Sequence, residues 1–306
     1  MSTAEEFRRM SESVRNWGRW GSDDERGTLN LISDAHRVRA ASLVRSGRVF
    51  DLGLPLDSNG PQRGGLRTNP IRLMSAAGAS PDHPEQFCFA DDYVIMPLQS
   101  GTQWDALGHV WCDETLYNGF PAASVTSRGL AHVSIDRLAP GIVGRGVLLD
   151  VARHRGVERL SAGEQIDGDD LEAVAAAQGV AITEGDILLV RTGWSLTFAA
   201  GDRDTFMSAE PGLSPDAVGW LARQDVAALA CDNWGIGAKP GRDPMDFYHT
   251  HLLLLRDVGM PLGELFVLEE LAEDCAADGC YEFFFCSEIL KFTGGAGTPT
   301  NPVALK

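Results

Sequence analysis

The chain has 306 residues, enough for one large domain or two small ones, and 44% of them are hydrophobic, an ordinary share for a globular protein. Its net charge of −17 argues against nucleic acid or an anionic membrane surface as a partner, because phosphate groups are bound by basic patches. A small anionic ligand stays compatible with this charge, since one or two well-placed arginines are enough to bind it.

The distribution of apolar residues and cysteines indicates the compartment. The N-terminus is polar, and no run of about 18 apolar residues occurs, so we expect a cytoplasmic protein that does not cross a membrane. The cysteines show no CxxC spacing, which favours buried free thiols over disulfides or a zinc knuckle. They are Cys88, Cys112, Cys231, Cys275, Cys280 and Cys286.

The first third of the chain is predicted to mix short regular elements with loops. Residues 4–17 form an amphipathic pattern with Phe7, Met10 and Val14 on one stripe, which predicts a helix. The aromatic and charged segment 17–30 is either a capped turn into a helix at 34–45 or a lid over a site. Residues 49–55 are expected to form a strand. Residues 57–91 are rich in Gly, Pro, Ser and Asn, which predicts a long surface loop at a substrate entrance.

The rest of the chain alternates apolar strands with short helices. Strands are predicted at 147–151, 187–191, 226–231 and 281–286, a loop at 113–127, and helices at 166–178 and 214–223. This alternation indicates an α/β fold with a central sheet buried on both faces. No linker divides the chain, so we expect one domain over residues 1–306. Neither GxGxxG nor a P-loop occurs, so the sequence gives no sign of a dinucleotide or a nucleoside triphosphate.

The stretch at 98–111, LQSGTQWDALGHVW, carries four polar side chains that suit a site: Gln99, Gln103, Asp105 and His109. It follows the apolar run 93–96, and strands often present chemistry where they run into a turn. Gln103 and Asp105 are two residues apart and share a face of an extended chain. Gln99 and Gln103, like Asp105 and His109, are four apart, which suits a helical turn.

A second informative stretch begins with His249 and His251, ahead of four leucines. Glu264 follows within an apolar run, where a carboxylate is costly unless it is paired or binds a metal. Asp232 and Asn233 come directly after a predicted strand, so they are either site residues or a pair that starts a turn.

The first stretch resembles the signature of the cyclase and kynurenine formamidase-like metal-dependent hydrolases, written His-x-Gly-Thr-His-x-Asp-x-Pro-x-His. Gly101, Thr102, Asp105 and His109 match it; Gln99 and Gln103 replace the two early histidines, and Leu107 replaces the proline. The resemblance extends from about Trp17 to the C-terminus. His251 and Glu264 fit the family's later histidine and glutamate, with His249 as the rival histidine, and residues 294–302 resemble its closing Gly/Pro turn.

The resemblance implies a single-domain, swivelling β/β/α fold with a central mixed sheet, residues 1–33 packed near the site, and a homo-oligomer. It implies a divalent metal held by a set drawn from Gln99, Gln103, Asp105, His109 and His251. Catalysis is assigned to His251, oriented by Glu264, and to His109. A glutamine oxygen is a harder and weaker donor than an imidazole, so manganese is expected over zinc.

The implied activity is hydrolysis of a cyclic or aryl amide, imide or lactone in a small-molecule substrate. Two alternatives stay open: a metal-independent cyclase or isomerase acting on a polyketide-like substrate, and a non-catalytic homologue that binds a small molecule. Arg191 or Lys239 is expected to hold a substrate carboxylate. Four tryptophans either wall an aromatic pocket or belong to the core: Trp104, Trp111, Trp194 and Trp234. His36, His132 and His154 are interpreted as structural and His83 as an exposed loop residue.

Overall fold

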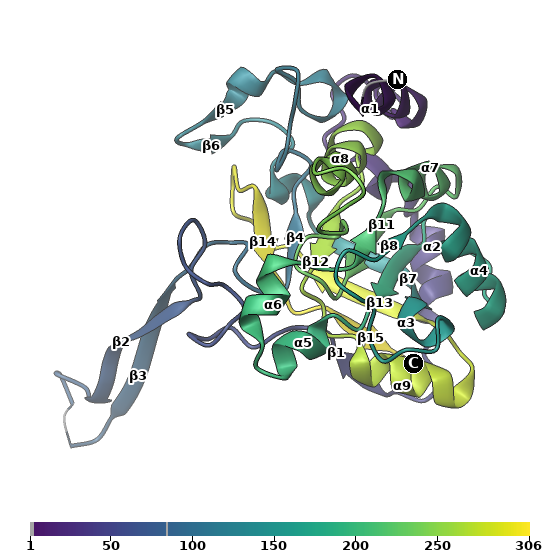
Figure 1. Ribbon diagram of the computed structural model, residues 1–306. Coiled ribbons are helices and arrows are strands. Elements are labelled where there is room, and N and C mark those ends of the chain that lie inside the picture. The colour runs from purple at the N-terminus through teal and green to yellow at the C-terminus, as the bar shows by residue number, and fades with distance from the viewer. Residues whose placement is uncertain (1–2, 84) are drawn as a thin grey trace.

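The computed structural model describes residues 3–83 and 85–306 and is built on a mixed nine-stranded sheet (Figure 1). The strand order is β1-β15-β13-β7-β9-β11-β12-β4-β14. Their bounds are β1 Val49–Asp51, β15 Val303–Leu305, β13 Glu282–Glu288, β7 Gly141–Asp150, β9 Ile187–Arg191, β11 Ala228–Cys231, β12 Leu262–Glu264, β4 Gln103–Asp105 and β14 Gly297–Pro299. This mixed α/β architecture confirms the predicted fold class.

Helices and three small ribbons complete the chain. The α-helices are α1 Thr3–Val14, α2 Asp34–Ala41, α3 Val151–His154, α4 Gly168–Gln178, α5 Ser195–Ala199, α6 Arg203–Ser208, α7 Pro215–Arg223, α8 Asp246–His251 and α9 Glu269–Asp278. The other helical segments are η1 Gly27–Leu31, η2 Tyr117–Gly119, η3 Ala122–Ser124, η4 Ile135–Leu138 and the π-helical η5 Leu252–Val258. The ribbons pair β2 Ile71–Ala79 with β3 Cys88–Ile95, β5 Val125–Thr126 with β6 Gly129–Leu130, and β8 Gln165–Ile166 with β10 Gly212–Leu213.

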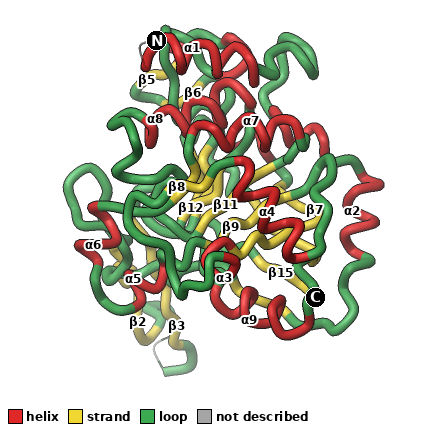
Figure 2. Tube along the Cα trace, turned by 45° about the vertical axis from the view of Figure 1, so that its right-hand side comes forward, coloured by secondary structure: helices red, strands yellow, loops and turns green. Residues whose placement is uncertain are grey.

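The central strands are buried on both faces, because their alternate side chains enter two different cores. On β9, Leu188 and Val190 pack into one core with residues of α4, α7 and η5, whereas Ile187 and Leu189 pack into a second core with residues of α9. Figure 2 shows helices α4 and α7 in front of the sheet and α9 beneath it. The apolar runs predicted as strands therefore lie where a doubly covered sheet requires them.

Parallel pairing is confined to the middle of the sheet, and both ends are antiparallel. Strands β7, β9, β11 and β12 pair in parallel, and β4 then pairs antiparallel with both β12 and β14. Strand β4 is the segment QWD of the central motif, so the polar residues 103–105 lie inside the sheet and are fully buried.

The N-terminal segment packs against the helical region that follows the histidines. Helix α1 contacts η5 and α7, and the Trp17 indole N–H donates to the Arg256 carbonyl at 2.7 Å. Asp24 accepts from the Gly27 backbone N–H at 2.9 Å and from the Tyr117 hydroxyl at 3.0 Å. This arrangement agrees with the capped-turn interpretation of residues 17–30.

The predicted loop at 57–91 is wrong at residues 71–79 and 88–91, which form strands. Strands β2 and β3 form an antiparallel hairpin that projects from the body of the molecule (Figure 1). Because nearly all of its side chains are exposed, neither strand carries the alternation of apolar and polar residues that marks a half-buried strand. The strand predicted at 49–55 ends at Asp51, two residues before Gly53.

The thiols are free, as predicted, but their predicted burial is only partly correct. Cys231 and Cys275 are buried, whereas Cys88 and Cys280 are exposed. Within residues 3–83 and 85–306, no helix is both long and apolar enough to cross a membrane.

Candidate active site

The carboxylates of the site come from two neighbouring strands. In β4 the Trp104 side chain points into the core, where its indole N–H donates to the Ser287 hydroxyl at 2.7 Å, so Gln103 and Asp105 share the opposite face. The register places Glu264 of β12 directly opposite Gln103. The Gln103 amide accordingly donates to Glu264 Oε2 at 2.7 Å and to Asp105 Oδ1 at 3.4 Å.

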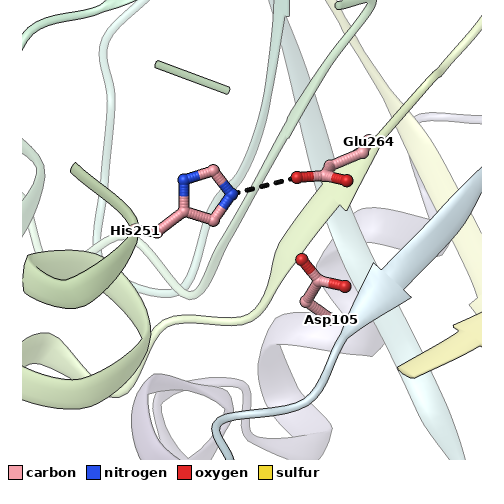
Figure 3. A group of neighbouring side chains, drawn as sticks. All are labelled: Asp105, His251 and Glu264. Carbon is pink, nitrogen blue, oxygen red and sulfur yellow. Dashed lines mark hydrogen bonds and ion pairs between the residues drawn. The ribbon is translucent and has the colours of Figure 1, made fainter. Parts of the chain in front are cut away.

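His251 reaches the same point from helix α8, as Figure 3 shows. Its Nε2 lies 3.0 Å from Glu264 Oε1, and its Nδ1 lies 3.2 Å from the Phe247 carbonyl oxygen. His249 faces elsewhere, stacked on Phe7 with ring centroids 4.3 Å apart. Of the two rival histidines, His251 is the one that the fold brings to the central motif, where it contacts Glu264.

Asp105 and Glu264 form a buried acidic pair in which Glu264 has two polar partners and Asp105 is poorly compensated. Asp105 is fully buried, and the pKa of its carboxyl is raised well above the ordinary value by loss of hydration and by the nearby Glu264. Asp105 Oδ2 and Gln103 Oε1 are both buried without a hydrogen-bond partner among the described residues. Such acceptors are costly unless a proton or a cation neutralises them.

These residues fit a divalent cation. One ligand atom from each of Asp105, His251 and Glu264 lies within 4.8 Å of the others. The unpartnered oxygens of Asp105 and Gln103 add the hard donors that magnesium- or manganese-type ions prefer. The fold therefore gathers Gln103, Asp105 and His251 from the predicted metal set and adds Glu264, which the sequence had assigned to orienting His251.

His109 and Gln99 lie at the border of this cluster. His109 Nε2 is 3.9 Å from Asp105 Oδ2, and burial, with smaller contributions from His251 and Arg67, lowers the pKa of His109 to about 3. The imidazole is thus neutral near pH 7, as a metal ligand or a proton acceptor must be. The Gln99 amide nitrogen lies beside Gly297, the residue paired with Asp105, where an added Cβ would be 2.7 Å from it.

The cluster opens into a cavity of about 410 Å³ with aromatic walls. Trp234 and Phe247 stack with centroids 6.4 Å apart and planes 13° apart. The lining residues are Arg67, His109, Val110, Trp111, Trp234, Phe247, Tyr248, His251, Leu252 and Glu264. A volume of this size and an apolar wall with a few polar groups suit a small, flat organic ligand.

Several predicted pocket residues lie elsewhere. Trp104 and Trp194 belong to the buried cores, so only Trp111 and Trp234 of the four tryptophans line the cavity. The expectation that Arg191 holds a substrate carboxylate has no support, because its guanidinium is buried against Asp150 at 2.9 Å and Glu269 at 2.6 Å. Lys239 Nζ lies 5.9 Å from the centre of the Phe247 ring.

Asp232 and Asn233 form hydrogen bonds with the backbone of neighbouring loops. Asp232 accepts from the backbone N–H groups of Thr192 and Gly193 at 2.8 and 2.7 Å, and burial raises its carboxyl pKa to about 6. The Asn233 amide donates to the carbonyl oxygens of Pro211 and Ile236. These contacts agree with the turn interpretation of the pair.

Five lining residues were not singled out from the sequence: Arg67, Val110, Phe247, Tyr248 and Leu252. Phe247 precedes His251 by four positions, the spacing of neighbours on one helical face, and this signal points to it. Tyr248 is exposed at the cavity edge. Arg67 lies in the Gly-rich segment before β2, where no periodicity indicates which way a side chain points.

A family model described as "Putative cyclase" matches residues 50–238, more than half of the chain. The chain belongs to this cyclase family. The family resemblance read from the GTQWD motif is thereby confirmed.

Solved structures of other proteins share the fold of this cyclase-family chain. A structure described as a novel cyclase is 40% identical, with a TM-score of 0.88, over 96% of this chain and 100% of that one. Isatin hydrolase A from Labrenzia aggregata, bound to benzyl benzoate, is 19% identical, with a TM-score of 0.64, over 89% of this chain and 98% of that one. A protein described as a predicted metal-dependent hydrolase from Bacillus stearothermophilus is 20% identical, with a TM-score of 0.55, over 85% and 98%.

No curated protein sequence matches the chain. The likeness to the isatin hydrolase and the Bacillus protein is a likeness of fold, since their identities are low. The chemistry of this cyclase-family member is therefore argued from its own side chains.

Proposed function

We propose that this cyclase-family protein is a metal-dependent hydrolase that opens an amide, imide or lactone bond in a cyclic or aryl substrate. The observation that carries the proposal is the buried set of Asp105, His251 and Glu264, whose ligand atoms lie within 4.8 Å of one another beside an aromatic cavity. The isatin hydrolase and the metal-dependent hydrolase of the same fold support this choice of reaction class.

The proposed ligands are Asp105, Glu264 and His251, with Gln103 Oε1 as an additional oxygen donor. Three oxygen-bearing side chains and one imidazole make a hard donor set, which favours manganese over zinc. A divalent ion held there would polarise the substrate carbonyl and lower the pKa of water in the site. Gln99 and His109 lie close enough to the set to be tested as further ligands.

The chain's own residues supply binding and proton transfer. His109 lines the cavity as a neutral imidazole, so it is the group proposed to take up a proton during attack and to return it to the leaving nitrogen or oxygen. The burial that lowers its pKa makes it a weak base in the first step and a strong acid in the second. The Phe247 carbonyl oxygen, 3.2 Å from His251 Nδ1, fixes the orientation of the His251 ring and leaves Nε2 facing the proposed metal site. The aromatic walls stack on a flat ring and exclude water from the reacting bond.

The His251–Glu264 hydrogen bond favours a second candidate function. Because His251 Nε2 is bonded to a carboxylate, the pair with His109 nearby is also an arrangement for acid–base catalysis alone. A metal-independent cyclase or isomerase uses these groups, and its activity survives chelation.

Metal analysis separates the two functions. We expect about one equivalent of manganese, measured by elemental mass spectrometry, in protein grown with added manganese salt, because two buried oxygens lack any other partner. Hydrolysis of isatin and of dihydrocoumarin is then measured with and without EDTA. Loss of turnover on chelation and recovery with manganese support the hydrolase. A metal-free protein that stays active in EDTA contradicts it.

We further propose that the protein is a homo-oligomer in which a second copy covers the β2–β3 hairpin. The pairs Ile71 with Ile95 and Leu73 with Tyr93 lie on one face of the hairpin, and each of the four side chains is 44% to 59% exposed. A two-stranded hairpin is marginally stable on its own. We therefore expect its exposed apolar face to be buried against a second copy of the chain.

We expect the double substitution L73D/Y93D to convert the oligomer to a monomer, because it places two charges on the face to be buried. The mass is measured by size-exclusion chromatography with light scattering. Arg72→Ser, on the opposite face of the same strand, is the control and is expected to keep the wild-type mass. A monomeric wild-type protein contradicts the proposal.

A further inference from the structure

We propose that Arg67 is an anion-binding residue that recognises a carboxylate carried by the aromatic substrate, which defines the substrate class as small aromatic carboxylates. This inference rests on the proposed function, because it places the substrate in the same cavity. The sequence had pointed to Arg191 or Lys239 for this role, and neither is among the residues that line the cavity.

Arg67 differs from its neighbours in having no counter-ion. Across residues 3–83 and 85–306, its guanidinium makes no hydrogen bond or ion pair, although it lines the cavity. Arg63, four residues earlier in the same loop, pairs with Asp204 at 2.7 Å. In a chain with a net charge of −17, an arginine that faces a pocket without an acidic partner leaves its donors for a ligand.

The guanidinium is held in place by stacking. Arg67 lies over the Trp234 ring, 5.1 Å from its centroid, and Trp234 stacks in turn on Phe247. This cation–π contact orders the side chain without using its N–H groups as hydrogen-bond donors to another residue. An arginine ordered in this way binds a carboxylate at a lower entropic cost than a mobile one.

Arg67 faces the acidic cluster of Asp105 and Glu264 but is not paired with either carboxylate among the described residues. It is near enough to lower the carboxyl pKa of Asp105 and the pKa of His109, yet it forms no ion pair with Asp105, whose Oδ2 has no partner. The cavity is thus polar at two places, Arg67 and the group of His109, His251 and Glu264, and most of its other lining residues are aromatic or apolar. A ligand that matches all of these features carries a carboxylate and a flat ring in addition to the bond that reacts.

The size of the cavity limits the ligand. About 410 Å³ is at the small end of ligand pockets, which corresponds to one or two fused rings with short substituents.

The test compares anthranilate with its neutral amide, anthranilamide, which has nearly the same shape. Binding is measured by isothermal titration calorimetry in EDTA, so that no metal binds the carboxylate. We expect the wild type to bind anthranilate about tenfold or more tightly than the amide. In Arg67→Gln the affinity for anthranilate falls about tenfold to a hundredfold, while the affinity for the amide stays within about twofold.

Two further variants control the test. Arg63→Gln, which removes the neighbouring arginine that is already paired, is expected to bind both probes as the wild type does. Arg67→Lys keeps the charge but loses the planar fork, so it is expected to restore only part of the preference.

Three results overturn the proposal: equal wild-type affinity for acid and amide, undiminished binding of anthranilate by Arg67→Gln, or failure of both probes to bind. Because the titration needs neither metal nor turnover, it is decided independently of the hydrolase proposal. If the protein hydrolyses isatin but shows no carboxylate preference, the proposed function is supported and the inference about Arg67 is contradicted. If it shows the preference but no hydrolysis, the inference about Arg67 is supported and the proposed function is contradicted.

Discussion

Replacing His251 with asparagine is expected to lower kcat for the hydrolysed substrate by about 10²- to 10⁴-fold, the range found when a residue of the acid–base machinery is removed. The imidazole contributes one of the three clustered ligand atoms and contacts Glu264 at 3.0 Å, so its loss disturbs both. The measurement is steady-state kinetics on the substrate found in the screen, with manganese content determined on the same samples.

His249→Asn is the matched control for this prediction. The two histidines lie on the same helix two positions apart, but His249 stacks on Phe7 instead of facing the site. We expect kcat of His249→Asn to stay within about threefold of the wild type, since the substitution changes only packing at a remote contact. A large loss of kcat in His249→Asn together with full activity in His251→Asn is the result that contradicts the assignment.

Local patterns in the sequence were enough to predict the side-chain directions in the central motif. Alternation along an extended chain puts Gln103 and Asp105 on one face, and the structure confirms this in β4. The cost of an unpaired carboxylate in an apolar run pointed to Glu264, which the structure places in the same cluster. In both cases the signal lies within a few residues.

Local patterns could not predict which of these residues contact one another. Gln103 and Glu264 are 161 positions apart, and their contact depends on the register between β4 and β12. The register is set by packing of the whole sheet, including the Trp104 side chain against Phe266 and Phe285. No local spacing indicates it, so the sequence assigned Glu264 only to orienting His251 and not to the metal set.

The same reasoning explains the errors around the cavity entrance. The hairpin strands expose both faces, so burial left no periodic pattern from which to predict them. Arg67 sits in the irregular segment before the hairpin, and its direction follows from the Trp234 ring, 167 positions later. The central strands were predicted because burial on both faces does leave a pattern, a continuous apolar run.

Substituting Asp105 with asparagine is expected to have two opposite effects. Metal content should fall from about one equivalent to near zero, because the variant lacks a charged ligand. The metal-free variant should nevertheless be more stable than the metal-free wild type, by about 1–4 kcal/mol in free energy of unfolding, since it removes a buried carboxylate whose Oδ2 has no hydrogen-bond partner among the described residues. Metal content is measured by elemental mass spectrometry and stability by denaturant unfolding in EDTA.

The dependence of this stability difference on pH tests its cause. The carboxyl pKa of Asp105 is raised in the folded protein, so the folded chain holds the proton more tightly than the unfolded chain does. The contribution of Asp105 to stability is therefore fully present below its unfolded pKa of about 3.9 and is lost as the pH rises through the raised folded pKa. The advantage of Asp105→Asn should accordingly grow with pH in EDTA and reverse when manganese is added. A metal-free variant that is less stable at every pH would show instead that Asp105 already has a stabilising partner in the metal-free protein.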